Sequence, residues 1–272
     1  MKIVRFLTED GQICLGSLVS EQPLEARVVR GNLFGELELT GQTVRINRLL
    51  SPLDPPNIIA VGLNYTGHAE ETKLSKPEIP VIFLKATTSV IGPDDPILLP
   101  SVGPDRVDYE AELAVIIGKR AKNVPLEEAL GYVLGYTCAN DVSARDWQID
   151  KQQKQWARGK SFDTFCPLGP CLVTGDEIPD PNILPIRAIL NERILQESNT
   201  SDMIFNVQTL ISNLSQSLTL LPGTVILTGT PQGVGFTRQP PVYLRAGDRI
   251  TIEIGGIGRL SNRVEREKAG MS

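Results

Sequence analysis

The segment from Asp108 to Gly118 constrains the fold of this chain more than any other. Its residues 113–117 are an unbroken apolar run, Leu-Ala-Val-Ile-Ile, which is typical of a buried strand. Because side chains alternate across a strand, Glu110 and Glu112 point to the same face. Two carboxylates beside an apolar strand repel each other and lose hydration, so they need a counter-charge. A hard divalent cation prefers carboxylate oxygen, and we therefore interpret this pair as one wall of a metal site.

A third oxygen ligand is needed, and Asp141 is the best candidate. It follows the apolar segment 136–140, a predicted strand, and precedes Ser143-Ala144-Arg145-Asp146, which has the form of a helix-capping box. Rigid scaffolds often present functional groups at such strand ends. The alternative for each of these carboxylates is a solvated surface ion pair, but a Glu-x-Glu on so apolar a strand favours the metal.

His68 is the single histidine of the chain. This excludes sites that need two or more histidine ligands, so any metal ligands are mostly oxygen. His68 and Glu71 would share one face of a helical turn, where the carboxylate could orient the imidazole as a general base. A surface histidine beside an unrelated glutamate fits the spacing equally well. The polar stretch from His68 to Pro80 could be a mobile lid.

Five further residues could contact an anionic substrate. Lys160 could bind a carboxylate or stabilise a developing enolate, and Arg145 could grip a carboxylate with two hydrogen bonds. Gln148 could donate a hydrogen bond, as could the backbone of Gly229 and the hydroxyl of Thr230. The alternatives are, in turn, an exposed lysine, an ion pair on a helix surface, a solvent-exposed amide and a tight turn.

The remaining pattern predicts mainly strands in hairpins. Asp10-Gly11 and Asn191-Glu192 each separate two runs that are typical of paired strands. Apolar residues at helical spacing predict helices over 126–134 and 207–218. With neither regular βαβ alternation nor an internal repeat, the predicted class is α+β, with a mixed and mainly antiparallel sheet system.

A domain boundary is predicted at residues 51–56. Their sequence, Ser-Pro-Leu-Asp-Pro-Pro, interrupts both helices and strands. We therefore expect a small N-terminal β domain, residues 1–50, and a main body, residues 55–266.

Composition narrows the possible partners and location. The net charge of −5 gives no basic surface for nucleic acid, and no apolar run is long enough to span a membrane. The four cysteines form no Cys-x-x-Cys pair, which argues against a disulfide framework. Residues 1–6 lack the apolar core of a signal peptide, so we expect a cytosolic protein.

Five motifs occur in an order typical of the fumarylacetoacetate hydrolase family. They are Asn64-Tyr65-x-x-His68-x-x-Glu71, Asp108-Tyr109-Glu110-x-Glu112, Asn140-Asp141-x-x-Ala144-Arg145-Asp146, Gly159-Lys160-Ser161-Phe162-Asp163 and Thr228-Gly229-Thr230-Pro231. Over residues 55–265 the chain resembles this family. The run 163–170 is similar to the branch that includes fumarylacetoacetate hydrolase domain-containing protein 2.

The resemblance implies a catalytic domain of β-roll or β-sandwich type, usually homodimeric, with bound Mg²⁺ or Mn²⁺. By motif match, the metal ligands would be Glu110, Glu112 and Asp141, and the acid–base dyad on a lid would be His68 and Glu71. The lysine that polarises the substrate would be Lys160. Contacts to the substrate's carboxylate and oxo groups would come from Arg145, Gln148 and Thr230.

The resemblance also implies a small 2-oxo acid substrate and a metal-bound enolate. Keto–enol tautomerisation, decarboxylation of a β-keto acid and hydrolytic cleavage of an acylpyruvate share that intermediate. We predict oxaloacetate or a close relative, tautomerised or decarboxylated. The alternatives are an acylpyruvate or fumarylpyruvate hydrolase and, in a different class, a metal-stabilised binding protein without turnover.

Overall fold

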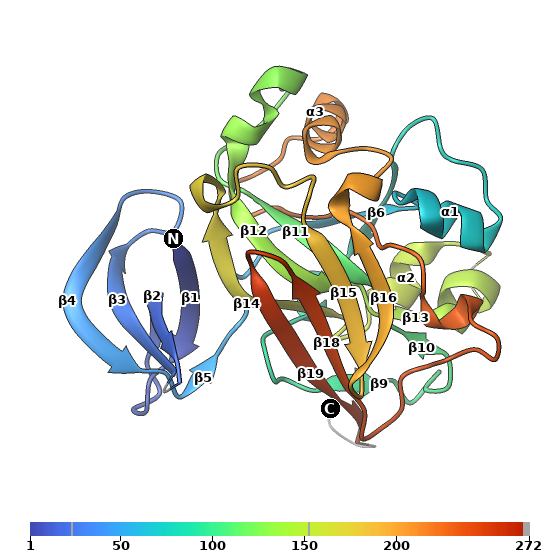
Figure 1. Ribbon diagram of the computed structural model, residues 1–272, viewed down its shortest axis with the longest axis horizontal. Helices are drawn as coiled ribbons and strands as arrows, with labels where there is room; N and C mark the ends of the chain where they lie inside the picture. The colour runs from blue at the N-terminus through green and yellow to red at the C-terminus, as the bar shows by residue number, and fades with distance from the viewer. Residues whose placement is uncertain (23, 152, 269–272) are drawn as a thin grey trace.

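Strands outnumber helices in the computed structural model, which describes residues 1–22, 24–151 and 153–268 (Figure 1). The largest sheet has the strand order β4-β3-β2-β1-β14-β12-β11-β17-β6-β7, with β5 beside β1 and β8 beside β14. In that order its strands are Leu37–Arg45, Leu24–Gly31, Ile13–Glu21, Lys2–Leu7, Cys166–Thr174, Val133–Asn140, Ala111–Ile117, Val225–Leu227, Ile58–Gly62 and Val81–Lys85, then Arg48–Leu49 and Val90–Ile91.

A second sheet, in the order β16-β15-β18-β19-β9, lies in front of β11, β12 and β14 in Figure 1. Its strands are Arg193–Asn199, Pro185–Leu190, Arg249–Ile254, Gly258–Arg266 and Ile97–Leu99. A two-stranded sheet pairs β10 (Val107–Asp108) with β13 (Ser143–Ala144). Most pairings are antiparallel and a few are parallel, so the predicted α+β class with a mixed, mainly antiparallel sheet system is confirmed.

The helices are short and lie at the edges of the sheets. The α-helices are α1 (Thr66–Thr72), α2 (Trp156–Lys160) and α3 (Val207–Ser217), and the tighter or wider turns are Thr87–Ser89, Leu126–Tyr132, Asp146–Lys151, Gly175–Glu177, Thr200–Asp202 and Gly235–Thr237. The helix expected over 207–218 is confirmed. The helix expected over 126–134 forms over Leu126–Tyr132 as a 3₁₀ helix, and only its last two residues differ, because Val133 begins β12.

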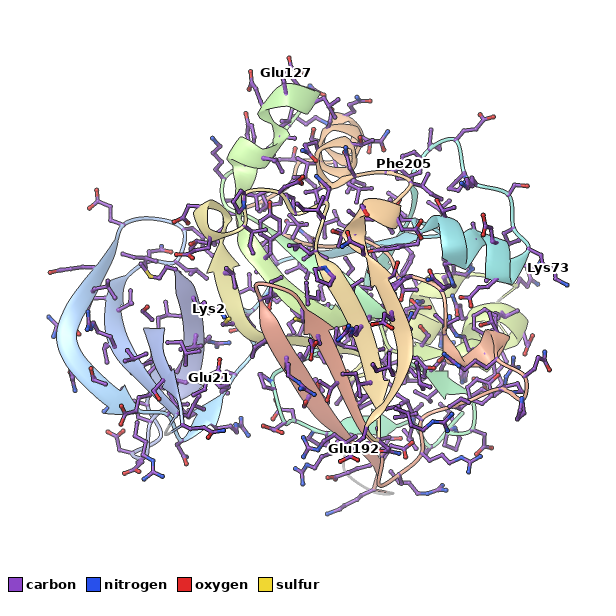
Figure 2. The ribbon with its side chains drawn as sticks, in the orientation of Figure 1. Lys2, Glu21, Lys73, Glu127, Glu192 and Phe205 are labelled. Atoms are coloured by element: carbon purple, nitrogen blue, oxygen red, sulfur yellow. The ribbon has the colours of Figure 1, made fainter. Side chains whose placement is uncertain are left out.

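Strand β11 forms the centre of the core. All seven of its residues are buried, and its two faces pack against different apolar clusters. Leu113 and Val115 face the second sheet, whereas Ala114 and Ile116 pack with β6 and β17. Burying each large aliphatic side chain contributes about 1.5–3 kcal/mol, which explains the unbroken apolar run. Figure 2 shows that Lys73, Glu127 and Glu192, by contrast, lie at the periphery.

The N-terminal strands continue the large sheet. The β1–β2 hairpin turns at Gly11, whose φ of +79° favours glycine, as the sequence predicts. Strand β1 also pairs with β14, with Lys2 opposite Val173, so sheet hydrogen bonds cross the expected boundary at residues 51–56. The division into two domains stays a prediction. No helix of the described residues has the length and hydropathy needed to cross a membrane.

Candidate active site

The buried charges of this protein gather in one place. Among the described residues seven charged side chains are buried, namely Lys85, Asp108, Glu110, Glu112, Asp141, Arg145 and Lys160. They lie at, or directly behind, the wall of a cavity of about 660 Å³. Because a buried charge is costly unless it is paired, such a concentration marks a functional site.

The three predicted metal ligands lie together at one end of the β11–β12 pair. Ala111 is opposite Asn140 in this antiparallel pair, and the Asp141 N–H donates to the backbone oxygen of Glu110 (2.9 Å). Glu110, Glu112 and Asp141 therefore reach the same face. One carboxylate oxygen of each lies within 4.8 Å of the others.

Two lysines neutralise part of this charge. Lys160, at the end of α2, places its Nζ 2.6 Å from Glu110 Oε2 and 2.7 Å from Asp141 Oδ2. Lys85, at the end of β7, donates to Asp141 Oδ1 (2.5 Å). Burial opposes the ionisation of Glu110, but Lys160 and Arg145 outweigh it and lower the pKa of Glu110 to about 2.

Among the residues that the structure describes, no cation forms an ion pair with Glu112. Its carboxylate accepts the Gly229 N–H (2.7 Å), and burial, followed by the neighbouring Asp141 and Glu110, raises the pKa of Glu112 well above its usual range. In the buried cluster four carboxylates face three cations, which leaves one negative charge uncompensated. A hard divalent cation would compensate this negative charge. Because Glu110, Glu112 and Asp141 offer only oxygen donors, they fit such an ion.

His68 and Glu71 form the predicted pair on helix α1. The distance from His68 Nδ1 to Glu71 Oε1 is 2.7 Å, and the other carboxylate oxygen of Glu71 accepts from the Gly233 N–H (2.9 Å) and the Thr237 hydroxyl (3.0 Å). Burial opposes the ionisation of Glu71, but the hydrogen bonds from His68 and Gly233 outweigh it and lower the pKa of Glu71. His68 lines the cavity and Glu71 stands behind it, so the second ring nitrogen is left for the cavity.

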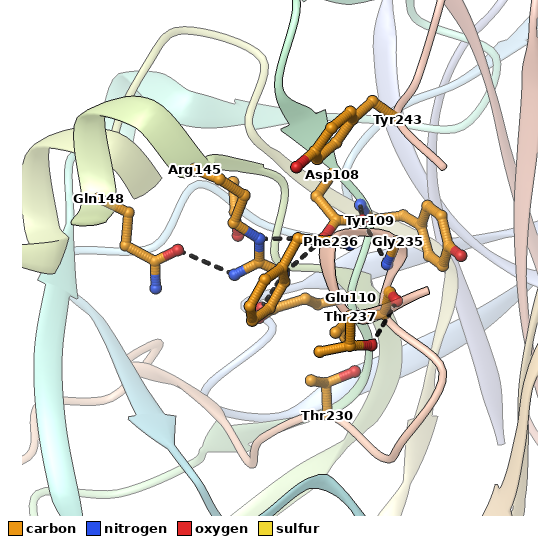
Figure 3. Close-up of polar contacts among 12 residues, drawn as sticks. Asp108, Tyr109, Glu110, Arg145, Gln148, Thr230, Gly235, Phe236, Thr237 and Tyr243 are labelled. Atoms are coloured by element: carbon orange, nitrogen blue, oxygen red, sulfur yellow. Dashed lines mark hydrogen bonds and ion pairs between the residues drawn. The ribbon is translucent and has the colours of Figure 1, made fainter. Parts of the chain in front are cut away.

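Arg145 is buried and holds two carboxylates of its own chain (Figure 3). Its Nε donates to Asp108 Oδ2 (2.9 Å), and its Nη2 lies 2.7 Å from Glu110 Oε1. The Phe236 ring lies against the guanidinium, with its centroid 4.3 Å from Arg145 Cζ. Arg145 still lines the cavity, but its first role in this structure is to hold Glu110, rather than to wait free for a substrate carboxylate.

Gln148 and Thr230 line the cavity, and each has one polar function already engaged. Gln148 Oε1 accepts from Arg145 Nη1 (2.8 Å), so the Gln148 amide hydrogens remain for a ligand. Thr230 Oγ1 accepts from Gln196 Nε2 (2.8 Å). Both are therefore placed as donors toward an anion.

Gly229 lies directly behind the carboxylate cluster. Its N–H is engaged by Glu112, and it lies outside the cavity wall. Its φ is +97°, and a Cβ at this position would lie 2.7 Å from the Asn64 Cβ. Glycine is needed here because of this positive φ and the close approach of Asn64. That Gly229 contacts the substrate stays a prediction, and in this structure its N–H is engaged by Glu112.

Sequence reasoning missed three buried residues of the site. Lys85 holds Asp141, Asp108 holds Arg145 and the backbone N–H groups of residues 235 and 236, and Gln196 bridges Thr230 to strand β11. Asp108 could have been found, because it precedes the same apolar strand as Glu110. Lys85 and Gln196 carry no local signal.

The comparison with known sequences decides the family. Residues 57–265 match the sequence profile of the fumarylacetoacetate hydrolase C-terminal domain. The chain belongs to the fumarylacetoacetate hydrolase family. Residues 1–52 match a second profile, described as Rv2993c-like, N-terminal.

Relatives of known name share most of the catalytic region of this family member. The mitochondrial oxaloacetate tautomerase fahd2 of Xenopus laevis is 52% identical over 217 residues, which are 79% of this chain and 68% of the relative. The human mitochondrial oxaloacetate tautomerase FAHD2A is 47% identical over 216 residues, 79% of this chain and 68% of the relative. The branch expected from the run 163–170 is thereby confirmed.

Solved structures of the family superpose over nearly the whole chain. The 5-carboxymethyl-2-hydroxymuconate delta-isomerase of Mycobacterium smegmatis has a TM-score of 0.86 and 41% identity, covering 98% of this chain and 100% of its own. The fumarylacetoacetate hydrolase of Exiguobacterium antarcticum has a TM-score of 0.87 and 38% identity, with the same coverage.

These similarities settle two expectations. Similar proteins are named as a tautomerase, an isomerase and a hydrolase, so the chain is an enzyme. The alternative of a binding protein without turnover is therefore set aside. The expected cytosolic location is wrong, because the similar Xenopus, rat and human proteins are mitochondrial. The lack of a signal-peptide core in residues 1–6 was too weak an argument for a compartment.

Proposed function

We propose that this enzyme interconverts the enol and keto forms of oxaloacetate, with Mg²⁺ or Mn²⁺ held by Glu110, Glu112 and Asp141. One observation carries the proposal: a carboxylate-backed imidazole, His68, faces the same cavity as three clustered carboxylates and a lysine ammonium. The names of the Xenopus and human relatives support this substrate.

The reaction moves one proton between a carbon and an oxygen, and we assign this transfer to His68. Toward the keto form, the charged imidazole gives a proton to the carbon next to the keto group, and the enol hydroxyl proton passes to the imidazole that this step leaves neutral. Glu71 holds the ring through Nδ1 at 2.7 Å, so the other nitrogen is left to face the substrate. The bound cation would act as a Lewis acid that stabilises negative charge on the keto oxygen.

Other side chains hold the substrate anion. Burial opposes the charge of Lys160, but Asp141 and Glu110 outweigh it and raise the pKa of Lys160, so it stays an ammonium that can stabilise an enolate oxygen. The free amide hydrogens of Gln148 and the Thr230 hydroxyl can bind a carboxylate, and Arg145 keeps Glu110 in place.

We also expect a homodimer, which light scattering after size-exclusion chromatography would measure.

The test measures how fast the ultraviolet absorbance of enol oxaloacetate decays, with and without Mg²⁺. The uncatalysed rate of decay is subtracted. We expect rapid decay with the enzyme, deuterium incorporation at the carbon when the solvent is D₂O, and little release of pyruvate. His68→Gln should abolish the acceleration and leave Mn²⁺ binding unchanged by calorimetry. Equal decay with and without enzyme would refute the tautomerase, and stoichiometric pyruvate would favour decarboxylation.

A further inference from the structure

Gln196 joins two walls of the active site from behind. It lies on β16, is 1% exposed, and is outside the cavity wall. Its Oε1 accepts the N–H of Ala111 (2.9 Å), the residue between Glu110 and Glu112. Its Nε2 donates to Thr230 Oγ1 (2.8 Å) and to the backbone oxygen of Pro231 (2.8 Å).

These partners fix which end of the amide is oxygen. A backbone N–H can only donate and a backbone carbonyl can only accept, so the atom facing Ala111 must be oxygen and the atom facing Pro231 must be nitrogen. The second amide hydrogen of Gln196 then goes to the Thr230 oxygen. Thr230 therefore receives a hydrogen bond from behind and must place its own hydroxyl hydrogen elsewhere.

The cavity is where that hydrogen can go. Within the described part of the chain, no side chain or backbone oxygen accepts it, and Thr230 is 3% exposed and lines the cavity. A hydroxyl aimed in this way is a donor that suits a carboxylate or keto oxygen. If the Gln196 amide were reversed or replaced by a pure acceptor, the hydroxyl would turn back and offer the substrate a lone pair instead.

We propose that Gln196 is a positioning residue that directs the Thr230 hydroxyl hydrogen toward the substrate and fixes the Thr230-Pro231 loop to strand β11. This inference rests on the proposed function, because it assigns Thr230 to the grip on the 2-oxo acid. It adds a residue that touches neither substrate nor metal. Since the grip acts in the bound and reacting states alike, its loss should raise KM more than it lowers kcat.

The experiment combines Gln196→Glu, Gln196→Met and Thr230→Val with the two double variants. Glutamate can accept from Ala111 and from the Thr230 hydroxyl, but it has no hydrogen for Pro231, so it pulls the hydroxyl hydrogen out of the cavity. Methionine removes both functions without adding charge. Glu197→Gln is the control, because Glu197 is the next residue of the same strand and faces solvent.

Each variant is assayed for enol oxaloacetate turnover at saturating Mg²⁺ and for binding of oxalate, a small dicarboxylate probe. We expect KM and the oxalate Kd to rise roughly tenfold to a hundredfold in all three single variants, since a hydrogen bond to a charged group is lost. Each double variant should be no worse than Thr230→Val alone, because Gln196 acts through Thr230.

Three results would overturn the inference: an unchanged KM in either Gln196 variant, losses that multiply in a double variant, or an unchanged KM in Thr230→Val. The last result is obtained with Gln196 intact, so it does not depend on how well the Gln196 variants fold. Melting temperature and Mn²⁺ affinity identify a variant that has merely unfolded. If wild-type enzyme fails to accelerate enol decay, the proposed function falls instead, and the oxalate titrations still report on Gln196.

Discussion

The Glu71→Gln substitution tests the acid–base dyad most directly, because it removes a charge and keeps the shape. The Glu71 carboxylate accepts three hydrogen bonds, from His68, the Gly233 N–H and the Thr237 hydroxyl. A glutamine has one acceptor oxygen. Two donors meet it on the loop side and one on the histidine side, so we expect the oxygen to face the loop and the NH₂ group to face His68 Nδ1.

That arrangement inverts the histidine. Nδ1 must then accept, so the ring hydrogen moves to the nitrogen that faces the cavity, and the imidazole is no longer a base there. The charged imidazolium also loses a carboxylate partner at 2.7 Å, which contributes about 1.5–3 kcal/mol. Together these losses should lower kcat by about a hundredfold or more.

The assay is the decay of enol oxaloacetate at saturating Mg²⁺, with Mn²⁺ affinity measured by calorimetry. Glu70→Gln is the matched control, because Glu70 is exposed on the same helix and its substitution removes the same charge. We expect the control to match wild type and metal affinity to be unchanged in both. A kcat for Glu71→Gln within about threefold of wild type would refute the dyad.

The same substitution predicts a change in acid stability. Because the folded-state pKa of Glu71 is lowered, the folded protein binds fewer protons at this site than the unfolded chain does. The stability that Glu71 contributes is therefore present above about pH 4.3, its unfolded value, and is lost as the pH falls through the folded value. The melting temperature of Glu71→Gln should fall less steeply with acid than that of wild type.

Two further substitutions test the buried cluster, and a third tests the cavity wall. Glu112→Gln removes the uncompensated charge, so the melting temperature of metal-free enzyme should rise above pH 5 while stabilisation by Mg²⁺ is largely lost, and scanning calorimetry with and without Mg²⁺ would show both. Lys85→Met leaves Asp141 with a weaker counter-charge and should cost about 3–5 kcal/mol in urea unfolding. Gly62→Ala would place a Cβ 2.2 Å from the Trp156 ring at the cavity wall, and should destabilise by about 1–3 kcal/mol and raise KM.

Local patterns carried the parts of the site that one strand or one helical turn defines. Glu110 and Glu112 lie on one face because side chains alternate, and His68 meets Glu71 because they lie three residues apart on α1. Asp141 needed only the pairing of β11 with the next long strand. In each case the sequence separation or the hairpin itself brings the groups together.

Long-range contacts explain what sequence reasoning missed. Lys85 reaches Asp141 across 56 residues and Gln196 reaches Ala111 across 85, and neither contact leaves a periodic trace in the chain. The end of the helix expected over 126–134 differs for a related reason. Residues 126–132 are helical, but Val133 pairs with Ile117 of β11, a contact that the apolar spacing does not reveal.

One loop connects the two halves of the proposed chemistry. Residues 233–237 donate to Glu71 through Gly233 and Thr237, and to Asp108 through the backbone N–H groups of Gly235 and Phe236. Asp108 holds Arg145, and Arg145 holds Glu110 (Figure 3). The histidine's carboxylate and a predicted metal ligand are thus set by the same short segment. A change in this loop should therefore disturb the proposed proton carrier and the proposed cation site together.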